Sequence, residues 1–157
     1  LKYLEELLKP GMNVLDVGCG SAILSIAAAK LGARDVLGIE IDPVAVKIAK
    51  SNSINNLVQE NVEVIQGDFT SMNIPVNSYE IVVANISSKL ISESAPQLFS
   101  AIDPGGILIA SGILSDREVD VKDNLTDAGF SVKRRMNEGD WVALVATINN
   151  GLSNEDI

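Results

Sequence analysis

The stretch from residue 13 to residue 24 constrains the fold of this chain more than any other. Its first apolar residues predict a buried strand, which the triplet Gly18-Cys19-Gly20 interrupts. Apolar residues then recur at helical spacing over residues 22–31. Because glycine allows a tight turn and lets the backbone approach a ligand, this order of strand, glycine turn and helix predicts the start of a nucleotide-type binding site.

The residues around the turn indicate which ligand it takes. The third glycine of the dinucleotide fingerprint is replaced by Ile23, and the P-loop pattern is absent. Asp16 precedes Gly18 by two residues, and a carboxylate there favours a cation over a pyrophosphate. S-adenosylmethionine carries a sulfonium and an ammonium and no phosphate. Asp-x-Gly-x-Gly after a first strand resembles motif I of the class I methyltransferases; the alternative is a glycine turn in any α/β domain.

The length of 157 residues predicts one domain, and no apolar run approaches the roughly 18 residues that span a membrane. No secretory signal is recognisable, and the first residue is Leu, so we expect a piece of a longer chain or a processed one. Cys19 is the only cysteine, which excludes an internal disulfide and fits a reducing cytoplasm. We therefore expect a cytoplasmic protein without a membrane partner, and interpret Cys19 as a small filler of the turn.

The chain contains no histidine, which excludes Ser-His-Asp and Cys-His catalysis and His-ligated metal sites. We expect no metal and a cofactor that supplies the reactive group. The net charge of −9 disfavours direct binding of nucleic acid and suits a basic protein substrate.

Periodicity and turn residues give an alternating order of elements. The predicted helices cover residues 1–8, 22–31, 42–52, 89–102 and 116–128, and the predicted strands residues 14–17, 36–41, 62–65, 79–84, 107–110, 131–135 and 141–148. This order predicts an α/β, Rossmann-like, seven-stranded sheet over residues 1–148, mostly parallel, with helices on both faces and a closing antiparallel hairpin. Residues 149–157 are expected to form a polar, frayed tail.

Several local features carry specific expectations. Asp42-Pro43 predicts an N-cap followed by proline in the first helical position. We expect Pro96 to kink or split its helix, and Pro104-Gly105-Gly106 to form a turn before a strand that Ser111-Gly112 closes. The apolar face of the helix that Asp42 caps is assigned to Val44, Val46, Ile48 and Ala49.

Ligands of open parallel sheets lie beyond the carboxyl ends of the strands, so residues there are the candidates for the site. Glu40 ends the second strand and can accept hydrogen bonds from both ribose hydroxyls of a nucleoside. Asp42 is the alternative, but its position fits a helix cap. Ile41 either packs on the adenine face or belongs to the core.

Asp68 follows the third strand and can accept a hydrogen bond from the adenine amine, with Phe69 close to the ring. The alternative is an acid in an ordinary Gly-Asp turn. Tyr79 and Trp141 are interpreted as packing residues, and Lys133-Arg134-Arg135 as a solvated strand end.

Asn85 ends the fourth strand and is the candidate catalytic residue. Methyl transfer needs an amine lone pair aimed at the sulfonium methyl, and an amide oxygen can orient the amine through its N–H groups. The alternative is a turn residue. No general base is evident, and an amine can lose its proton before it binds. The predicted cofactor-binding residues are Asp16, Gly18, Cys19, Gly20, Glu40, Ile41, Asp68, Phe69 and Asn85.

From about Leu4 to Val145 the chain resembles the bacterial methyltransferase family that modifies ribosomal large-subunit protein eleven. The matching stretches are Leu15-Asp16-Val17-Gly18-Cys19-Gly20-Ser21 with Ile23-Leu24, Ile26-Ala27-Ala28-Ala29-Lys30-Leu31-Gly32-Ala33, Gly38-Ile39-Glu40-Ile41-Asp42-Pro43, Val82-Val83-Ala84-Asn85-Ile86, Pro104-Gly105-Gly106 and Ser111-Gly112-Ile113-Leu114. The resemblance implies methyl transfer from S-adenosylmethionine to lysine and N-terminal amino groups of a ribosomal protein. It also implies cofactor contacts at Gly18, Glu40 and Asn85, with Asn85 nearest the accepting amine.

The chain departs from this family at three positions. Ala22 replaces the usual glycine, Glu40 the usual aspartate, and Ser87 an apolar residue. The family's amino-terminal substrate-recognition domain and its linker, which contributes a threonine to the cofactor, are expected to be absent, which predicts weak binding of cofactor and ribosomal protein. Three alternatives stay open: a class I methyltransferase for another protein or a small molecule, an NAD-dependent oxidoreductase, and an inactive cofactor-binding domain.

Overall fold

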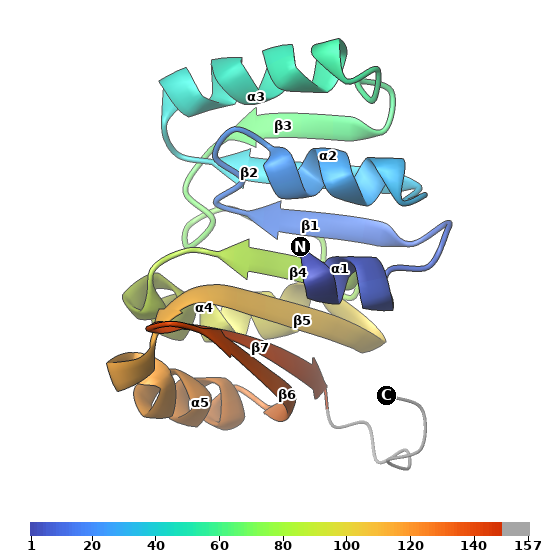
Figure 1. Cartoon of the computed structure of the whole chain (residues 1–157). Helices are drawn as coiled ribbons and strands as arrows, with labels where there is room; N and C mark the ends of the chain where they lie inside the picture. The colour runs from blue at the N-terminus through green and yellow to red at the C-terminus, as the bar shows by residue number, and fades with distance from the viewer. Residues whose placement is uncertain (149–157) are drawn as a thin grey trace.

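The computed structural model describes residues 1–148, which form a seven-stranded sheet in the order β3-β2-β1-β4-β5-β7-β6 (Figure 1). The strands are β1 (Asn13–Val17), β2 (Asp35–Glu40), β3 (Val62–Gln66), β4 (Tyr79–Asn85), β5 (Ile102–Leu114), β6 (Phe130–Glu138) and β7 (Trp141–Ile148). Strands β3, β2, β1, β4 and β5 pair in parallel, and β7 joins β5 and β6 in antiparallel pairs. The predicted fold class is confirmed. The predicted tail, residues 149–157, lies outside the described residues.

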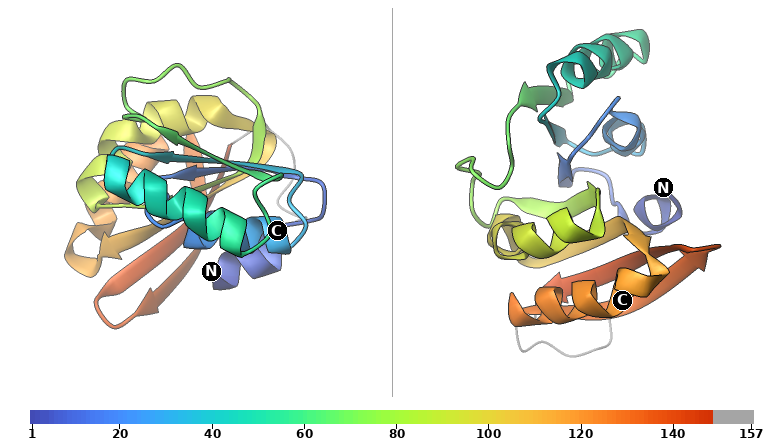
Figure 2. Two further views of the ribbon diagram at one scale, coloured as in Figure 1. Left: turned by 90° about the horizontal axis from the view of Figure 1, so that it is seen from above. Right: turned by 90° about the vertical axis from the view of Figure 1, so that its left-hand side faces the viewer.

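Helices cover both faces of this sheet (Figure 2). They are α1 (Lys2–Leu7), α2 (Ile23–Lys30), α3 (Pro43–Asn55), α4 (Ser88–Ala101) and α5 (Glu118–Asp127), with a 3₁₀ turn, η1, at Ser115–Arg117. Helices α1, α2 and α3 lie on one face, and α4 and α5 lie on the other. Among the described residues, no helix is long and apolar enough to cross a bilayer.

The two faces divide the core into two clusters. In β1, Val14 packs with α1, α2 and α3, whereas Leu15 and Val17 pack with α4 and α5. Successive strand residues point to opposite faces, so a strand covered on both sides is apolar at nearly every position. This explains why the central strands have continuous apolar runs.

Helix α4 runs unbroken through Pro96, so the expected split of this helix is wrong. Ile91, Ala95 and Leu98 are fully buried against the sheet on either side of the proline. Burial of this apolar stripe stabilises the helix enough to offset the hydrogen bond that Pro96 cannot donate.

Strand β5 is longer than expected, at 13 residues. Pro104-Gly105-Gly106 lies inside it rather than in a turn, and its pairing with β4 shifts register between Tyr79 and Ile81. A second shift, in the pairing with β7, falls between Ala110 and Ile113, so Ser111-Gly112 does not close the strand. These irregularities let one long strand absorb the glycines, and they carry its end, Leu114, beyond the end of β4.

Helix α3 begins as predicted, with the Asp42 Oδ1 accepting a hydrogen bond from Val44 N at 2.8 Å. It continues to Asn55, three residues past the predicted end. The predicted apolar face is wrong in part, because Val44 and Ile48 are 60% and 47% exposed. Val46 and Ala49 alone of the predicted face are buried.

In the basic cluster Lys133-Arg134-Arg135 on β6, the interpretation as a solvated strand end is wrong for Arg134 and Arg135, which both form ion pairs. The Arg134 guanidinium contacts the Glu6 carboxylate at 2.7 Å and lies over the Tyr3 ring at 4.9 Å from its centroid. Arg135 Nε donates to both carboxylate oxygens of Glu118, at 2.8 and 3.0 Å. These contacts attach α1 and α5 to the edge strand.

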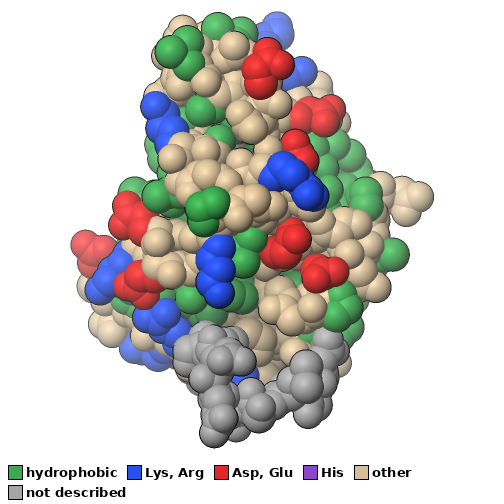
Figure 3. Space-filling model, turned by 90° about the vertical axis from the view of Figure 1, so that its right-hand side faces the viewer, with side chains coloured by type: hydrophobic (Ala, Val, Ile, Leu, Met, Phe, Trp, Pro, Cys, Tyr) green, Lys and Arg blue, Asp and Glu red, His purple; other side chains and the backbone are tan. Residues whose placement is uncertain are grey.

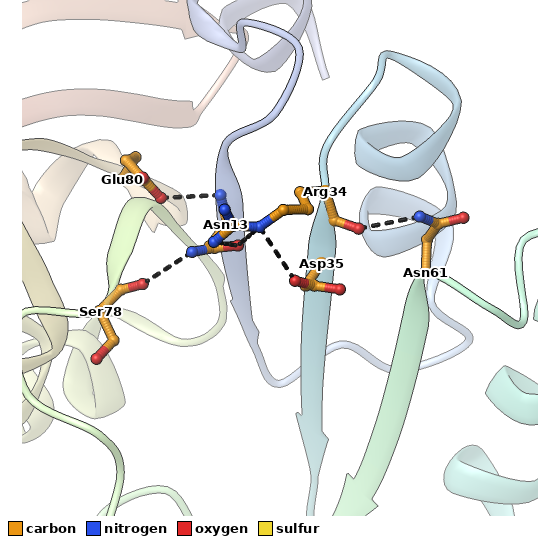
Figure 4. A network of polar contacts seen from close by, with 6 residues as sticks. All are labelled: Asn13, Arg34, Asp35, Asn61, Ser78 and Glu80. Carbon is orange, nitrogen blue, oxygen red and sulfur yellow. Dashed lines mark hydrogen bonds and ion pairs between the residues drawn. The ribbon is translucent and has the colours of Figure 1, made fainter.

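The amino-terminal edge of the sheet is held by a polar network (Figure 4). Arg34 Nε and Nη2 donate to Asn13 Oδ1 at 3.1 and 2.9 Å, and Asn61 Nδ2 donates to the Arg34 carbonyl at 2.9 Å. The Asn13 backbone N–H donates to Glu80 Oε2 at 2.8 Å. Figure 3 shows this side of the molecule, where acidic and basic side chains are interspersed. The network joins the starts of four strands.

Candidate active site

The glycine turn after β1 is fastened to the end of β2. The backbone N–H groups of Gly18 and Cys19 both donate to the Ile39 carbonyl, at 2.8 and 3.0 Å. Gly18 has φ +68°, and a Cβ there would collide with the Ile86 side chain. Glycine is therefore required at this position both for its conformation and for its space.

The Glu40 carboxylate binds backbone N–H groups of the glycine turn and of the residues that follow β2. Its Oε2 accepts a hydrogen bond from Gly20 N at 2.9 Å, and its Oε1 accepts from Ile41 N and Asp42 N at 2.9 and 3.0 Å. A carboxylate offers about four acceptor positions, so further donors can share it. Because the Asp42 carboxylate is occupied as the helix cap, Glu40 is the acid of this pair that faces the turn.

A cleft of about 390 Å³ opens beside Glu40 at the carboxyl edge of the sheet. It brings together five of the residues predicted from the sequence: Gly18, Glu40, Ile41, Asp68 and Phe69. We call this cavity the Glu40 cleft. Its apolar and acidic lining matches what a nucleoside needs, a flat contact for the base and acceptors for its hydroxyl and amino groups.

Two residues within the Glu40 cleft differ in exposure. Ile41 is 64% exposed, whereas Phe69 is buried. The Asp68 Oδ1 accepts from the Thr70 hydroxyl and the Thr70 N–H, at 2.7 and 2.9 Å, and these bonds lower the pKa of the Asp68 carboxyl. Asp68 is therefore an ionised acceptor at neutral pH.

Asp16 and Cys19 lie toward α2 and do not line the Glu40 cleft. Asp16 is 2% exposed, its Oδ2 accepts from the Ser25 hydroxyl at 2.6 Å, and burial raises the pKa of its carboxyl to about 6. Burial likewise raises the pKa of the Cys19 thiol to about 12, so this thiol stays protonated and inert. Contact of Asp16, Cys19 and Gly20 with a cofactor stays a prediction.

Asn85 lies in a second cavity, of about 600 Å³, next to the Glu40 cleft. We call it the Asn85 cavity; it is lined by Asn85, Ile86, Ser87, Ser88, Gly112, Leu114 and Trp141. Ile86 lines both cavities, so the two meet at this side chain.

The position of Asn85 is fixed by β5. The Ser111 hydroxyl donates to Asn85 Oδ1 at 3.0 Å. At Gly112, with φ +78°, a Cβ would lie 2.8 Å from the Ile86 carbonyl oxygen and 3.1 Å from Asn85 Oδ1. The close approach of β5 to Asn85 therefore depends on glycine.

Sequence reasoning missed Trp141 and Leu114. Trp141 is 56% exposed and Leu114 42%, so the interpretation of Trp141 as a packing residue is wrong, whereas Tyr79 is buried as predicted. One signal was available: β7 follows a hairpin and runs antiparallel to β5, so its first residue lies at the edge where the parallel strands end. Among the described residues, no group of three or more His, Cys, Asp and Glu side chains gathers as metal ligands do.

The sheet order, the glycine turn after β1 and the acid at the end of β2 define the class I methyltransferase fold. The structure resembles the "ribosomal protein L11 methylase" of Lactobacillus delbrueckii subsp. bulgaricus, with TM-score 0.86 and 28% identity over 92% of this chain and 74% of that one. It also resembles a "SAM dependent methyltransferase" of Aquifex aeolicus, with TM-score 0.75 and 26% identity over 92% of this chain and 87% of that one.

Residues 1–149 match the sequence model of the family described as "Ribosomal protein L11 methyltransferase (PrmA)". The chain belongs to this family. A relative of that name from Pelotomaculum thermopropionicum is 42% identical over 148 residues, which cover 94% of this chain and 47% of the relative. The chain thus spans about half the length of the curated relatives it matches.

Proposed function

We propose that this chain is the catalytic part of a methyltransferase, which binds S-adenosylmethionine in the Glu40 cleft and transfers its methyl group to an amine in the Asn85 cavity. The observation that carries the proposal is the meeting of the two cavities at Ile86. Transfer between two molecules needs adjoining sites, because donor and acceptor atoms must approach to about 3 Å.

The charge of the Glu40 cleft supports a cationic ligand. Its lining includes the carboxylates of Glu40, Asp68 and Glu93, of which Glu93 pairs with Lys89 at 3.7 Å, and none of the described residues that line it is Lys or Arg. Like charges repel at this range, so a pyrophosphate is disfavoured and a sulfonium with an ammonium is favoured. This argument replaces the one based on Asp16, whose carboxyl is buried, and it opposes the NAD-dependent alternative.

Different residues of the Glu40 cleft would bind the ribose and the adenine of the nucleoside. Glu40 would accept hydrogen bonds from the ribose hydroxyls, sharing the carboxylate that now holds Gly20 N. Asp68 would accept from the adenine amine, while Ile41 and Phe69 lie beside the ring. When bound, the cofactor supplies an electrophilic methyl carbon, and its sulfur leaves with the bonding electron pair.

The Asn85 cavity suits a neutral amine on an apolar stem. Ser111 uses one acceptor position of Asn85 Oδ1, and the other is available to an amine N–H. Trp141 and Leu114 present the exposed apolar surface against which a lysine's methylene groups can lie. None of the lining side chains ionises near neutral pH, so desolvation favours the uncharged amine, the form that carries a free lone pair.

We infer that the acceptor is a lysine or N-terminal amino group of ribosomal protein L11 and that the reaction belongs to the cytoplasm. The support is membership of the family and relatives named for that activity at about 40% identity. Incubating ribosomal subunits with labelled cofactor and the full-length protein tests the acceptor. Label in L11 is expected, and label in another component instead would favour a different substrate.

The cofactor site is tested by calorimetric titration with S-adenosylhomocysteine. Glu40→Ala removes a charged acceptor of two ribose hydrogen bonds, which should weaken binding by about 2–4 kcal/mol, or roughly 30- to 1000-fold. Glu60→Ala, which removes an exposed carboxylate far from the cleft, is the matched control and should bind like the wild type. Equal affinity of the Glu40→Ala variant and the wild type, or tight binding of NADH, would refute the assignment.

A further inference from the structure

The Asn85 cavity continues into a third cavity, of about 490 Å³, across the start of α4. Both cavities are lined by Ser87, Ser88 and Leu114, so these residues form the threshold between them. The Leu114 N–H donates to the Ser88 hydroxyl at 3.4 Å and holds the threshold together. We call the third cavity the flanking groove; beyond the threshold it is lined by Lys89, Ser92, Arg117, Asp120 and Val121.

The flanking groove is lined by residues of the start of α4, the end of β5, the η1 turn and α5. Figure 1 shows that α4 and α5 lie on the same face of the sheet. The groove shares no lining residue with the Glu40 cleft, although its Lys89 pairs with Glu93 of that cleft at 3.7 Å. A cofactor in the Glu40 cleft therefore does not account for it. A chain that delivers an amine to Asn85, in contrast, has to continue somewhere on the surface, and the groove adjoins that point.

The charged side chains of the flanking groove indicate which kind of ligand it binds. Lys89 and Arg117 face it from different elements, and their side chains are 83% and 63% exposed. Their acidic partners, Glu93 and Asp120, are each 3.7 Å away in exposed pairs. Such pairs are weak, and a ligand carboxylate can compete for the cations. Among the described residues that line the groove there are two cations and one acid, Asp120, because Glu93, the partner of Lys89, lines the Glu40 cleft instead.

We propose that the flanking groove binds the polypeptide segment next to the accepted amine, and that Lys89 and Arg117 select an acidic side chain in it. The inference rests on the proposed function, because it takes the Asn85 cavity as the acceptor site. It adds a specificity element: an amine flanked by acidic residues is preferred over the same amine in a neutral or basic segment.

Binding of fluorescein-labelled nonapeptides, followed by anisotropy in the presence of S-adenosylhomocysteine, tests the groove. Each peptide has a central lysine in an Ala/Ser background, with Glu, Gln or Arg on both sides of it. Wild-type protein should bind the Glu peptide more tightly than the Gln peptide. Lys89→Glu/Arg117→Glu should weaken the Glu peptide by roughly fivefold or more, since two exposed ion pairs are lost, and should strengthen the Arg peptide.

The matched control is Lys47→Glu/Lys50→Glu, the same charge change on two exposed residues of α3. It should leave the peptide preference unchanged. Equal binding of the Glu and Gln peptides, or equal effects of the two double variants, would overturn the proposal. Methyl transfer measured on the same peptides separates the two claims: transfer without the charge preference rejects only the groove, whereas charge-dependent binding without transfer rejects the proposed function and leaves the groove.

Discussion

The substitution Gly112→Ala tests the packing that holds Asn85 in place. Gly112 has φ +78°, and an added Cβ would lie 2.8 Å from the Ile86 carbonyl oxygen and 3.1 Å from Asn85 Oδ1. The contact with the Ile86 oxygen is too short for a real Cβ and the contact with Asn85 Oδ1 is tighter than most, so either β5 or the end of β4 must move. The Asn85 cavity should therefore be distorted more than the Glu40 cleft, which Gly112 does not line and which shares only Ile86 with that cavity.

The magnitude has two parts. A left-handed conformation costs a residue with a Cβ about 1–2 kcal/mol. Overpacking against the Ile86 backbone adds about 1–3 kcal/mol, so the free energy of unfolding should fall by about 2–5 kcal/mol. Misplacing a reacting group by about 1 Å can cost roughly 100-fold in rate, and the smaller shift required here should lower kcat by about tenfold.

Gly139→Ala is the matched control, because Gly139 also has positive φ, +58°, but a Cβ there would meet nothing within 4 Å. It should cost only the conformational part, about 1–2 kcal/mol, with kcat unchanged. Urea unfolding, methyl-transfer rates and calorimetry with S-adenosylhomocysteine give the three quantities. Equal losses of stability and rate in the two variants would refute the argument from crowding. A loss of cofactor affinity in Gly112→Ala as large as its loss of rate would show that the distortion is not centred on the Asn85 cavity.

Two further predictions concern pH. Burial raises the pKa of Asp16 to about 6, so the folded chain keeps a proton that the unfolded chain releases near pH 4. The free energy of unfolding should therefore fall by about 3 kcal/mol between pH 4 and pH 6. Asp16→Asn should remove this pH dependence, measured by urea unfolding, and an unchanged pH dependence would contradict the raised pKa. Hydrogen bonds from Arg135 and Lys122 lower the pKa of Glu118 to about 2. Its contribution to stability is therefore fully present above about pH 4.5 and is lost as the pH falls through 2. Glu118→Gln should lower the free energy of unfolding by about 1–2 kcal/mol at pH 7, and thermal melts that show the same loss at pH 2 would contradict this.

The fold was predictable because each central strand carries its own apolar pattern and its own turn. The Asp42 cap, the glycine turn and the closing hairpin are local signals that tertiary packing left unchanged. The predictions of secondary structure were wrong where tertiary packing outweighed the local conformational preference of a residue. Pro96 stays inside α4 because its neighbours are buried, and Gly105 stays inside β5 because a register shift accommodates it.

The candidate site was predictable only in part. One cleft is lined by Gly18, Glu40, Ile41, Asp68 and Phe69 because each ends or follows a parallel strand, and these strands end at the same edge. The hairpin predicts only the edge at which Trp141 lies, whereas its exposure depends on the length of β5 and its bulge, which no short pattern encodes. The burial of Asp16 likewise depends on which face of β1 it occupies, and therefore on the packing of α2 against that face.

The central claim is that the Glu40 cleft holds a nucleoside whose sulfur points toward Asn85. A crystal of the chain soaked with S-adenosylhomocysteine tests it most directly. The ribose hydroxyls should lie against the Glu40 carboxylate, the adenine beside Asp68, and the sulfur next to Ile86 where the two cavities meet. A Glu40 cleft that stays empty in such a crystal, and fills when NADH is soaked in its place, would contradict the claim.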